Sequence, residues 1–184
     1  MSCDRAGPAV PVVRVRAMTA AVKFLLADLE RDQGLPPPLL ALNNEFAQEL
    51  SYLSPEKAAH LVREAAMACR VGEADALLLA FDQDAAYDNP NFEWFRSRFE
   101  RFIYIDRVVV APAMRGRGLA RALYLALFSR AASLNHAQVV CEVNVDPPNP
   151  ASDAFHASLG FEQVGLAVLP RAGKTVRYFS RKIG

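Results

Sequence analysis

Hydrophobic positions along the chain follow two spacings, one typical of strands and the other typical of helices. Short runs rich in β-branched residues predict strands at residues 10–16, 67–71, 76–81, 102–110, 137–145, 161–169 and 175–183. Apolar residues three and four positions apart predict helices near residues 19–29, 39–50, 54–66, 90–99, 115–134 and 150–159. This order predicts an α/β fold with a mixed sheet and a hairpin-like end, and not a regular βαβ array.

Capping residues and turn residues support several of these boundaries. Thr19 can cap a helix whose apolar residues include Leu26, and Ser54 precedes a proline and an acidic first turn. Asn89 and Asn149 are each followed by proline, which suits the start of a short helix. Gly160 is expected to end the last helix, because glycine is common immediately after a helix.

Composition restricts both the class of protein and its partners. With 184 residues, 52% of them hydrophobic and 22% charged, the chain fits one globular domain over residues 1–184. A formal net charge of +1 gives no general attraction to nucleic acid or to an anionic membrane. The polar start does not resemble a signal peptide, and every apolar run is too short to span a bilayer. The three cysteines lack the spacing of a metal site, so we expect a cytoplasmic protein that binds no nucleic acid, membrane or metal ion.

A glycine-rich and arginine-rich turn joins a predicted strand to a predicted helix in VVVAPAMRGRGLARALYLALFSRA, residues 108–131. The first N–H groups of a helix have no partner inside the helix, and the helix dipole adds partial positive charge there. Gly116 and Gly118 would let a ligand approach the backbone, while Arg115, Arg117 and Arg121 add positive charge. A phosphate or diphosphate is therefore the natural ligand of this turn.

Other interpretations of the glycines fit less well. A dinucleotide fingerprint needs glycines directly after the strand, but residues 111–115 intervene and Arg121 occupies the place of the third glycine. Residues 173–175 look like the end of a nucleotide P-loop, but Val168 replaces its first glycine and a strand follows, so a hairpin turn is predicted there. A solvated basic helix start with no ligand is the remaining alternative.

The turn resembles the coenzyme A-binding motif of the GNAT family of N-acetyltransferases, which has V-x-P after a strand and R-x-x-G-x-A at a helix start. The chain has Val110-Ala111-Pro112 followed by residues 115–120, RGRGLA. The second half of the family pattern is present as Asn149 and then Gly160-Phe161. The resemblance covers residues 102–161, and before residue 102 it depends on the order of elements alone.

The resemblance implies a GNAT-like acyl-CoA N-acyltransferase fold and a binding site for acetyl-CoA. It implies that the backbone of residues 108–110 pairs with the pantetheine arm, while the amides of residues 115–120 take the pyrophosphate. The residues that would contact coenzyme A are Val108, Val109, Val110, Arg115, Gly116, Arg117, Gly118, Leu119, Ala120 and Asn149.

Acetyl transfer to an amine requires a group that takes the amine proton and a group that protonates the leaving thiolate. Strand alternation puts Glu142 and Asn144 on one face, and a carboxylate in an apolar strand is costly unless it is paired or functional. GNAT members that use a base often carry a glutamate here, so Glu142 is the candidate base. Alternatively, Glu142 is only hydrogen-bonded beside a cavity.

The candidate acid is a histidine. Asn149, Ser152 and His156 share one face of a predicted helix. The family usually has a tyrosine where this chain has His156, and that tyrosine protonates the thiolate. His156 could act as the acid at a pH closer to neutrality, or it could only hydrogen-bond the cofactor.

An aromatic segment at residues 83–101 interrupts the strands. Three phenylalanines at helical spacing, Phe92, Phe95 and Phe99, predict a stripe that faces the core. Tyr87 and Trp94 lie off this stripe and are candidates for a wall over the acceptor site. Asn44 and Asn144 are further candidates for contacts with an amine, and for Asn44 a solvated helix position is the alternative.

The sequence thus predicts a single-domain acetyltransferase that moves an acetyl group from acetyl-CoA to a primary amine of a small molecule or amino-acid-like acceptor. Residues 10–82 would form the acceptor-side half, residues 83–101 an insertion, and residues 102–183 the half that binds acetyl-CoA. The alternative is a non-catalytic sensor or partner domain that binds acyl-CoA. The oligomeric state is open between a monomer and a homodimer.

Overall fold

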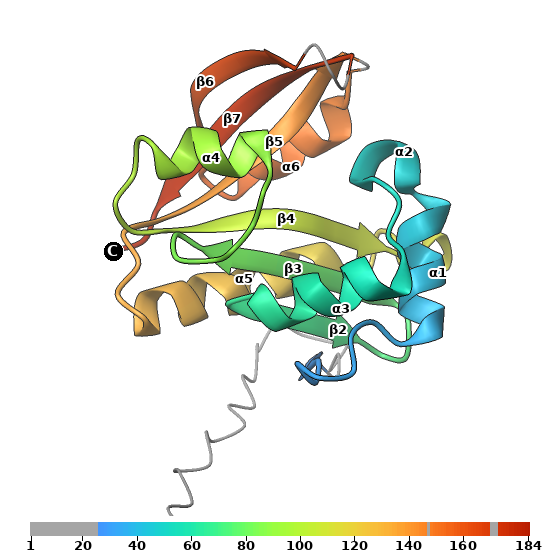
Figure 1. Ribbon diagram of the computed structural model, residues 1–184. Helices are drawn as coiled ribbons and strands as arrows, with labels where there is room; N and C mark the ends of the chain where they lie inside the picture. Colours follow the sequence, from blue (N-terminus) through green and yellow to red (C-terminus); the bar gives the residue numbers. More distant parts are fainter. Residues whose placement is uncertain (1–25, 147, 170–172) are drawn as a thin grey trace, which may run out of the picture.

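The computed structural model describes residues 26–146, 148–169 and 173–184. Its centre is a seven-stranded sheet with strand order β1-β2-β3-β4-β5-β7-β6 (Figure 1). The strands are β1 (Leu26–Asp28), β2 (Met67–Val71), β3 (Ala76–Asp82), β4 (Phe102–Val110), β5 (Gln138–Asp146), β6 (Glu162–Leu169) and β7 (Lys174–Lys182). The helices are α1 (Pro37–Glu45), α2 (Ala47–Leu50), α3 (Pro55–Glu64), α4 (Pro90–Arg96), α5 (Leu119–Ser133) and α6 (Pro150–Ser158).

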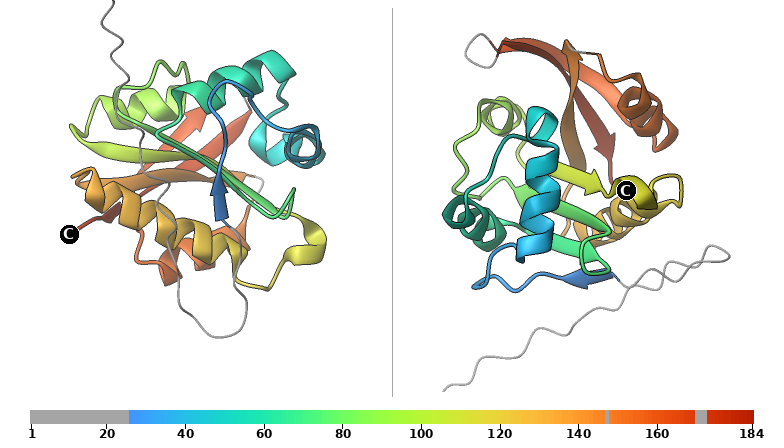
Figure 2. Two further views of the ribbon diagram at one scale, coloured as in Figure 1. Left: turned by 90° about the horizontal axis from the view of Figure 1, so that it is seen from below. Right: turned by 90° about the vertical axis from the view of Figure 1, so that its right-hand side faces the viewer.

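Two layers of helices cover the sheet. Helices α1, α3 and α4 cover one face, here the α1 face, where Leu39, Leu61 and Phe95 are buried. Helices α5 and α6 cover the opposite face, here the α5 face, where Leu123 is buried and Phe155 packs at the margin (Figure 2). The two hydrophobic cores are thus separated by the sheet, and the sheet positions the residues discussed below.

The pairing of β4 with β5 is short, and it is the one parallel pairing among the described strands. The paired residues run only from Phe102–Gln138 to Tyr104–Val140, although β4 continues to Val110. Beyond this point β5 turns away from β4 toward the β6–β7 hairpin (Figure 1). The divergence leaves the β5-facing edge of β4 beyond Tyr104 without a partner strand in the described structure, and we call this place the β4–β5 opening.

Most of the predicted elements are confirmed, together with their caps. Ser54 accepts a hydrogen bond from the backbone N–H of Lys57 at 3.2 Å and begins α3. Asn89 accepts from the N–H of Asn91 at 2.8 Å and begins α4, with proline at the first helical position. The predicted hairpin of the last two strands is also present as the antiparallel pair β6–β7.

The helix predicted after Thr19 is wrong where the structure describes it, since Leu26–Asp28 forms β1. This strand pairs with β2, and Leu26 lies opposite Val71. Apolar spacing over so few residues suits a helix or a strand equally, and pairing with the free edge of β2 decides the outcome. The strand predicted at residues 10–16 lies outside the described residues.

Two helices differ from the prediction, one because it is divided and the other because it begins later. The predicted helix 39–50 is divided at Phe46, which has φ −107° and ψ 31°. The predicted helix 115–134 begins only at Leu119, because Gly116 and Gly118 have φ values of 75° and 83°. In the described part of the chain, no helix is long and apolar enough to cross a membrane.

Candidate active site

The glycine turn leads from the end of β4 into α5. A short 3₁₀ turn at Pro112–Met114 follows β4, and Gly118 is the residue before the first turn of α5. A Cβ atom added at Gly116 or Gly118 would have no neighbour within 4 Å. The turn therefore has backbone that only glycine adopts readily, and it has free space into which a ligand could approach.

Arg115 connects the glycine turn to Phe46, the residue between α1 and α2. Its guanidinium lies over the ring of Phe46, 4.9 Å from the centroid, and its Nε donates to the carbonyl of Val110 at 3.3 Å. Arg117 is exposed on the same turn. Val108 and Val110 pack against the core of the α5 face, and Val109 is buried in the core of the α1 face.

A bulge in β4 places two charged side chains on the α1 face. Leu79 pairs with Arg107 and Ala80 pairs with Ile105, so Asp106 is the extra residue of the bulge. Asp106 and Arg107 form an ion pair whose side chains are only 4% and 3% exposed. Such a pair is stable in a core only when its remaining hydrogen-bonding groups are also satisfied.

The Asp106–Arg107 pair has these additional partners. The Tyr87 hydroxyl donates to Oδ1 of Asp106 and accepts from Nδ2 of Asn89 at 3.1 Å. Nη1 of Arg107 donates to Oδ1 of Asn43 at 2.9 Å. Asp106 and Arg107 were not predicted as site residues, although two adjacent charges inside an apolar strand are a visible signal in the sequence.

Glu142 lies on β5, two residues beyond its last pairing with β4. Its Oε1 accepts hydrogen bonds from Nδ2 of Asn91 at 2.9 Å and from the hydroxyl of Tyr104 at 3.0 Å. Its Oε2 is buried and has no hydrogen-bond partner among the described residues. An unpaired buried oxygen costs free energy, so this atom is suited to accept a proton or to bind a donor from a ligand.

The surroundings of Glu142 raise its pKa from 4.5 to about 7. Burial is the largest cause, and the carboxylate of Asp106 adds to it. The hydrogen bonds from Tyr104, from its own backbone and from Asn91 act in the opposite direction. A carboxyl group with this pKa is half ionised near neutral pH, which suits a general base.

His156 lies on α6 and is buried on the α5 face, with 5% of its surface exposed. Its Nδ1 is 2.8 Å from the carbonyl oxygen of Ser152, and its Nε2 is 2.8 Å from the hydroxyl of Tyr124. These partners fit a neutral ring that donates from Nδ1 and accepts at Nε2 from Tyr124. Burial lowers the pKa of His156, while the Ser152 bond and Asp153 oppose this change.

Glu142 and His156 therefore lie on opposite faces of the sheet. Glu142 shares the α1 face with Val140, whereas the ring of His156 is stacked on Phe179, which belongs to the core of the α5 face. The predicted alternation along β5 is confirmed. Asn149 accepts a hydrogen bond from the N–H of Ser152 at 3.1 Å and so caps α6.

Two of the residues predicted to contact the acceptor are tied into the fold. Nδ2 of Asn44 donates to the carbonyl of Leu53, and Oδ1 of Asn44 accepts from the N–H of Leu53, each at 2.9 Å. Asn44 thus holds the connection between α1 and α3. Trp94 stacks on Tyr178 at 4.1 Å and would meet any side chain added at Gly165. Trp94 thus packs against the β6–β7 hairpin.

The other two acceptor candidates are Tyr87, beside the Asp106–Arg107 pair, and Asn144, on the same strand as Glu142. Tyr87 is stacked on Phe81 at 4.4 Å, and its hydroxyl is bonded to Asp106. Asn144 is half-buried on β5, two residues after Glu142.

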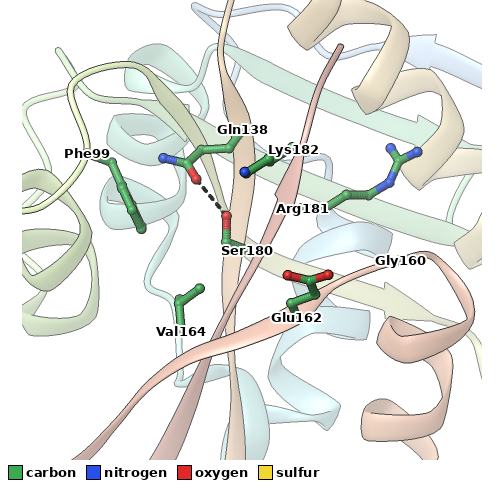
Figure 3. A pocket seen from close by; sticks show the side chains of 8 residues that line it. All are labelled: Phe99, Gln138, Gly160, Glu162, Val164, Ser180, Arg181 and Lys182. Carbon is green, nitrogen blue, oxygen red and sulfur yellow. Dashed lines mark hydrogen bonds between the residues drawn. The ribbon is translucent and has the colours of Figure 1, made fainter.

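A hollow of about 380 Å³ lies beside the first residue of β5 and the last residues of β7 (Figure 3). Gln138, the first residue of β5, lines it and is bonded to Ser180 at 2.7 Å. The other lining residues are Phe99, Gly160, Glu162, Val164, Arg181 and Lys182. None of these is a predicted site residue. In the described part of the chain, no group of three or more His, Cys, Asp or Glu side chains could hold a metal ion.

Comparison with known proteins identifies one family. The sequence model of the Acetyltransferase (GNAT) family matches residues 58–161. The solved structure of the ribosomal-protein-S18-alanine N-acetyltransferase from Escherichia coli matches with 16% identity and a TM-score of 0.59, covering 88% of this chain and 95% of that chain. A comparison with curated proteins finds no significant match.

Two further solved structures have a similar fold. Ard1 from Thermoplasma volcanium is 18% identical with a TM-score of 0.62, covering 89% of this chain and 99% of that chain. A chain of the NatC complex bound to Gag peptide and CoA is 11% identical with a TM-score of 0.64, covering 89% and 100%. At these identities the structural matches establish the fold.

Proposed function

The chain belongs to the GNAT acetyltransferase family, and from this premise we propose that it transfers an acetyl group from acetyl-CoA to the primary amine of a small or amino-acid-like acceptor. The observation that carries the proposal is the buried Oε2 of Glu142, which has no partner among the described residues and lies just beyond the last β4–β5 pairing. A carboxylate at this place can take the proton of an attacking amine.

The β4–β5 opening and the glycine turn would suit different parts of coenzyme A. The edge of β4 at Val108, Val109 and Val110 has no strand partner on the β5 side in the described structure, which leaves backbone groups for a pantetheine arm. The free space at Gly116 and Gly118 suits a diphosphate on the amides of residues 115–120. Bound acetyl-CoA would supply the activated acetyl thioester.

Glu142 would act on the acceptor side. An amine attacks as its neutral form, and the new C–N bond leaves a proton on nitrogen that must be removed. Oε2 of Glu142 would take this proton, because Oε1 already accepts two hydrogen bonds. With a pKa raised to about 7, the carboxyl group is ionised often enough near neutral pH to do so.

His156 would act on the leaving-group side, where the departing sulfur needs a proton. Its Nε2 is bonded to the hydroxyl of Tyr124 at 2.8 Å. A proton from His156 would therefore travel through this hydroxyl or require it to move aside. Asn149 would serve by capping α6, which carries His156.

The alternative function is a non-catalytic sensor or partner domain that binds acyl-CoA. The contacts of His156 favour this alternative, because both ring nitrogens are hydrogen-bonded and burial lowers the pKa of the ring. A histidine with a purely structural role has the same features. In that case Glu142 would also serve only the fold.

Release of thiol from acetyl-CoA over a panel of primary amines distinguishes the two functions. An enzyme releases thiol with at least one amine, and Glu142→Gln should lower turnover by roughly 10²-fold or more while acetyl-CoA binding stays unchanged. Glu162→Gln, which changes an exposed glutamate on β6, is the matched control. Tight acetyl-CoA binding without thiol release from any amine would instead identify a sensor.

The organisation and location of the protein remain predictions. We propose one domain over residues 1–184, with an acceptor-side half at residues 10–82, the insertion at residues 83–101 and a cofactor-binding half at residues 102–183. A cytoplasmic location is proposed from the sequence, as is the absence of nucleic-acid and membrane partners.

A further inference from the structure

Helix α4 lies against Glu142. It belongs to the segment whose residues Tyr87 and Trp94 are predicted to form a wall over the acceptor site. Asn91 is the second residue of α4 and is only 7% exposed. Its Nδ2 donates to Oε1 of Glu142 at 2.9 Å, and its Oδ1 accepts from the hydroxyl of Tyr178 at 2.9 Å. Both ends of the amide are therefore engaged, and its orientation is fixed because an ionised carboxylate only accepts hydrogen bonds.

A second donor reaches the same oxygen of Glu142 from β4. Tyr104 is fully buried and is the last residue of β4 that pairs with β5, and its hydroxyl lies 3.0 Å from Oε1. Oε1 thus has two donors from two elements, and Oε2 has none among the described residues. The carboxyl group is held by one oxygen and presents the other.

We propose that Asn91 and Tyr104 are positioning residues, which anchor Oε1 of Glu142 so that Oε2 is the oxygen that takes the proton of the acceptor amine. The inference rests on the proposed function, in which Glu142 is the base. It assigns a purpose to the insertion between β3 and β4: α4 orients the base. Two hydrogen bonds prevent the carboxyl group from turning, so its free lone pairs keep one direction.

The same two donors set the pH at which Glu142 is ionised. Burial and the Asp106 carboxylate favour the protonated form, and hydrogen bonds from Tyr104 and Asn91 favour the ionised form. Removing either donor should therefore raise the pKa of Glu142 further, and less of the base would be ionised at neutral pH.

The tyrosines and the cysteine near Glu142 do not titrate near neutral pH. Burial raises the pKa of Tyr104 on β4 and of Tyr124 on α5 well above 10, and raises that of Tyr178 on β7 to about 12. Burial likewise raises the pKa of the neighbouring thiol of Cys141. The nearby charges are those of Asp106 and its ion-pair partner Arg107, so a proton that binds near pH 7 is assigned to Glu142.

Carbon-13 NMR titration of glutamate side-chain carboxyls tests the inference directly in the folded protein, without acetyl-CoA. Glu142→Gln assigns the Glu142 resonance. Tyr104→Phe removes one oxygen atom, and Asn91→Leu replaces the amide by an apolar group of similar size. In each variant the pKa of Glu142 should rise from about 7 to about 8.

Tyr178→Phe is the matched control. It removes a buried hydroxyl from the same face but no hydrogen bond to Glu142. The pKa of Glu142 should therefore move by less than half as much as it does in Tyr104→Phe. If Asn91→Leu does not fold, Tyr104→Phe carries the test, because it keeps the ring. An unchanged Glu142 titration in folded Tyr104→Phe would overturn the inference.

Kinetics separate failure of the inference from failure of the proposed function. In the thiol-release assay, kcat/KM should rise with pH, and this rise should move to higher pH by about 1 in Tyr104→Phe, with most activity restored at pH 9. A general loss at every pH would indicate a structural role and count against positioning. If the parent protein releases no thiol with any amine, the proposed function fails; if Glu142→Gln keeps full activity, Glu142 is not the base. In either case the NMR titration still decides whether Asn91 and Tyr104 hold Glu142.

Discussion

Replacing Glu142 by glutamine should make the stability of the fold less sensitive to pH. Glutamine keeps an oxygen that can accept from Asn91 and Tyr104, but it removes the ionisable group. The folded-state pKa of Glu142 is raised from 4.5 to about 7, so folding favours the protonated form. The contribution of this group is fully present below pH 4.5, falls as the pH rises and is lost above about pH 7.

The size of the effect follows from the same pKa. A rise from 4.5 to about 7, at ~1.36 kcal/mol for each pKa unit, corresponds to about 3 kcal/mol. The residue is half-buried overall, so we take this value as an upper figure. An amide nitrogen in place of Oε2 would have no partner among the described residues, but this cost does not vary with pH.

Urea unfolding at several pH values between 4.5 and 8 measures the effect. Relative to the parent, Glu142→Gln should gain up to about 3 kcal/mol of unfolding free energy between the two ends of this range. Glu162→Gln, on the exposed edge strand β6, is the control for the loss of one carboxyl group. A flat difference for Glu142→Gln would mean that Glu142 ionises like a solvated carboxyl group, and the argument for a base near neutrality would be refuted.

Substitutions at two further positions test other parts of the structure. Gly165→Ala should lower the unfolding free energy by roughly 1–3 kcal/mol in urea unfolding, because a Cβ there would lie 2.5 Å from the Trp94 ring; unchanged stability would contradict this packing. His156→Phe should lower turnover in the thiol-release assay, and His156→Tyr should restore part of it. Because burial lowers the pKa of His156, any dependence on its protonated form should fade with rising pH below the ordinary value of 6.5. Full activity of His156→Phe at all pH values would exclude His156 as the acid.

Strong local signals in the sequence predicted most of the elements. Ser54 and Asn89, each followed by proline, mark helix starts that the structure confirms. The alternation along β5 correctly put Glu142 on the same face as Val140. The assignment of Leu26 failed because three residues carry too little periodic signal, and only the neighbouring strand decides their conformation.

The surroundings of Glu142 depend on contacts between residues far apart in the sequence. Asn91 is 51 residues from Glu142, and Tyr104 is 38 residues away. The bulge at Asp106 follows from the register of β3 against β4, and no local pattern predicts that register. The sequence thus indicated which carboxylate to consider but not which groups hold it.

Calorimetric titration with coenzyme A tests the central claim most directly, namely that the glycine turn holds the diphosphate. Gly118→Val would place a side chain in the free space beside the amides, and it should abolish or greatly weaken binding. Gly173→Val is the matched control, because Gly173 also has positive φ and free space but lies in the β6–β7 turn. Arg117→Ala should cost far less affinity than Gly118→Val, since the proposed contacts with the diphosphate come from the backbone amides. Unchanged coenzyme A binding by Gly118→Val would contradict the account.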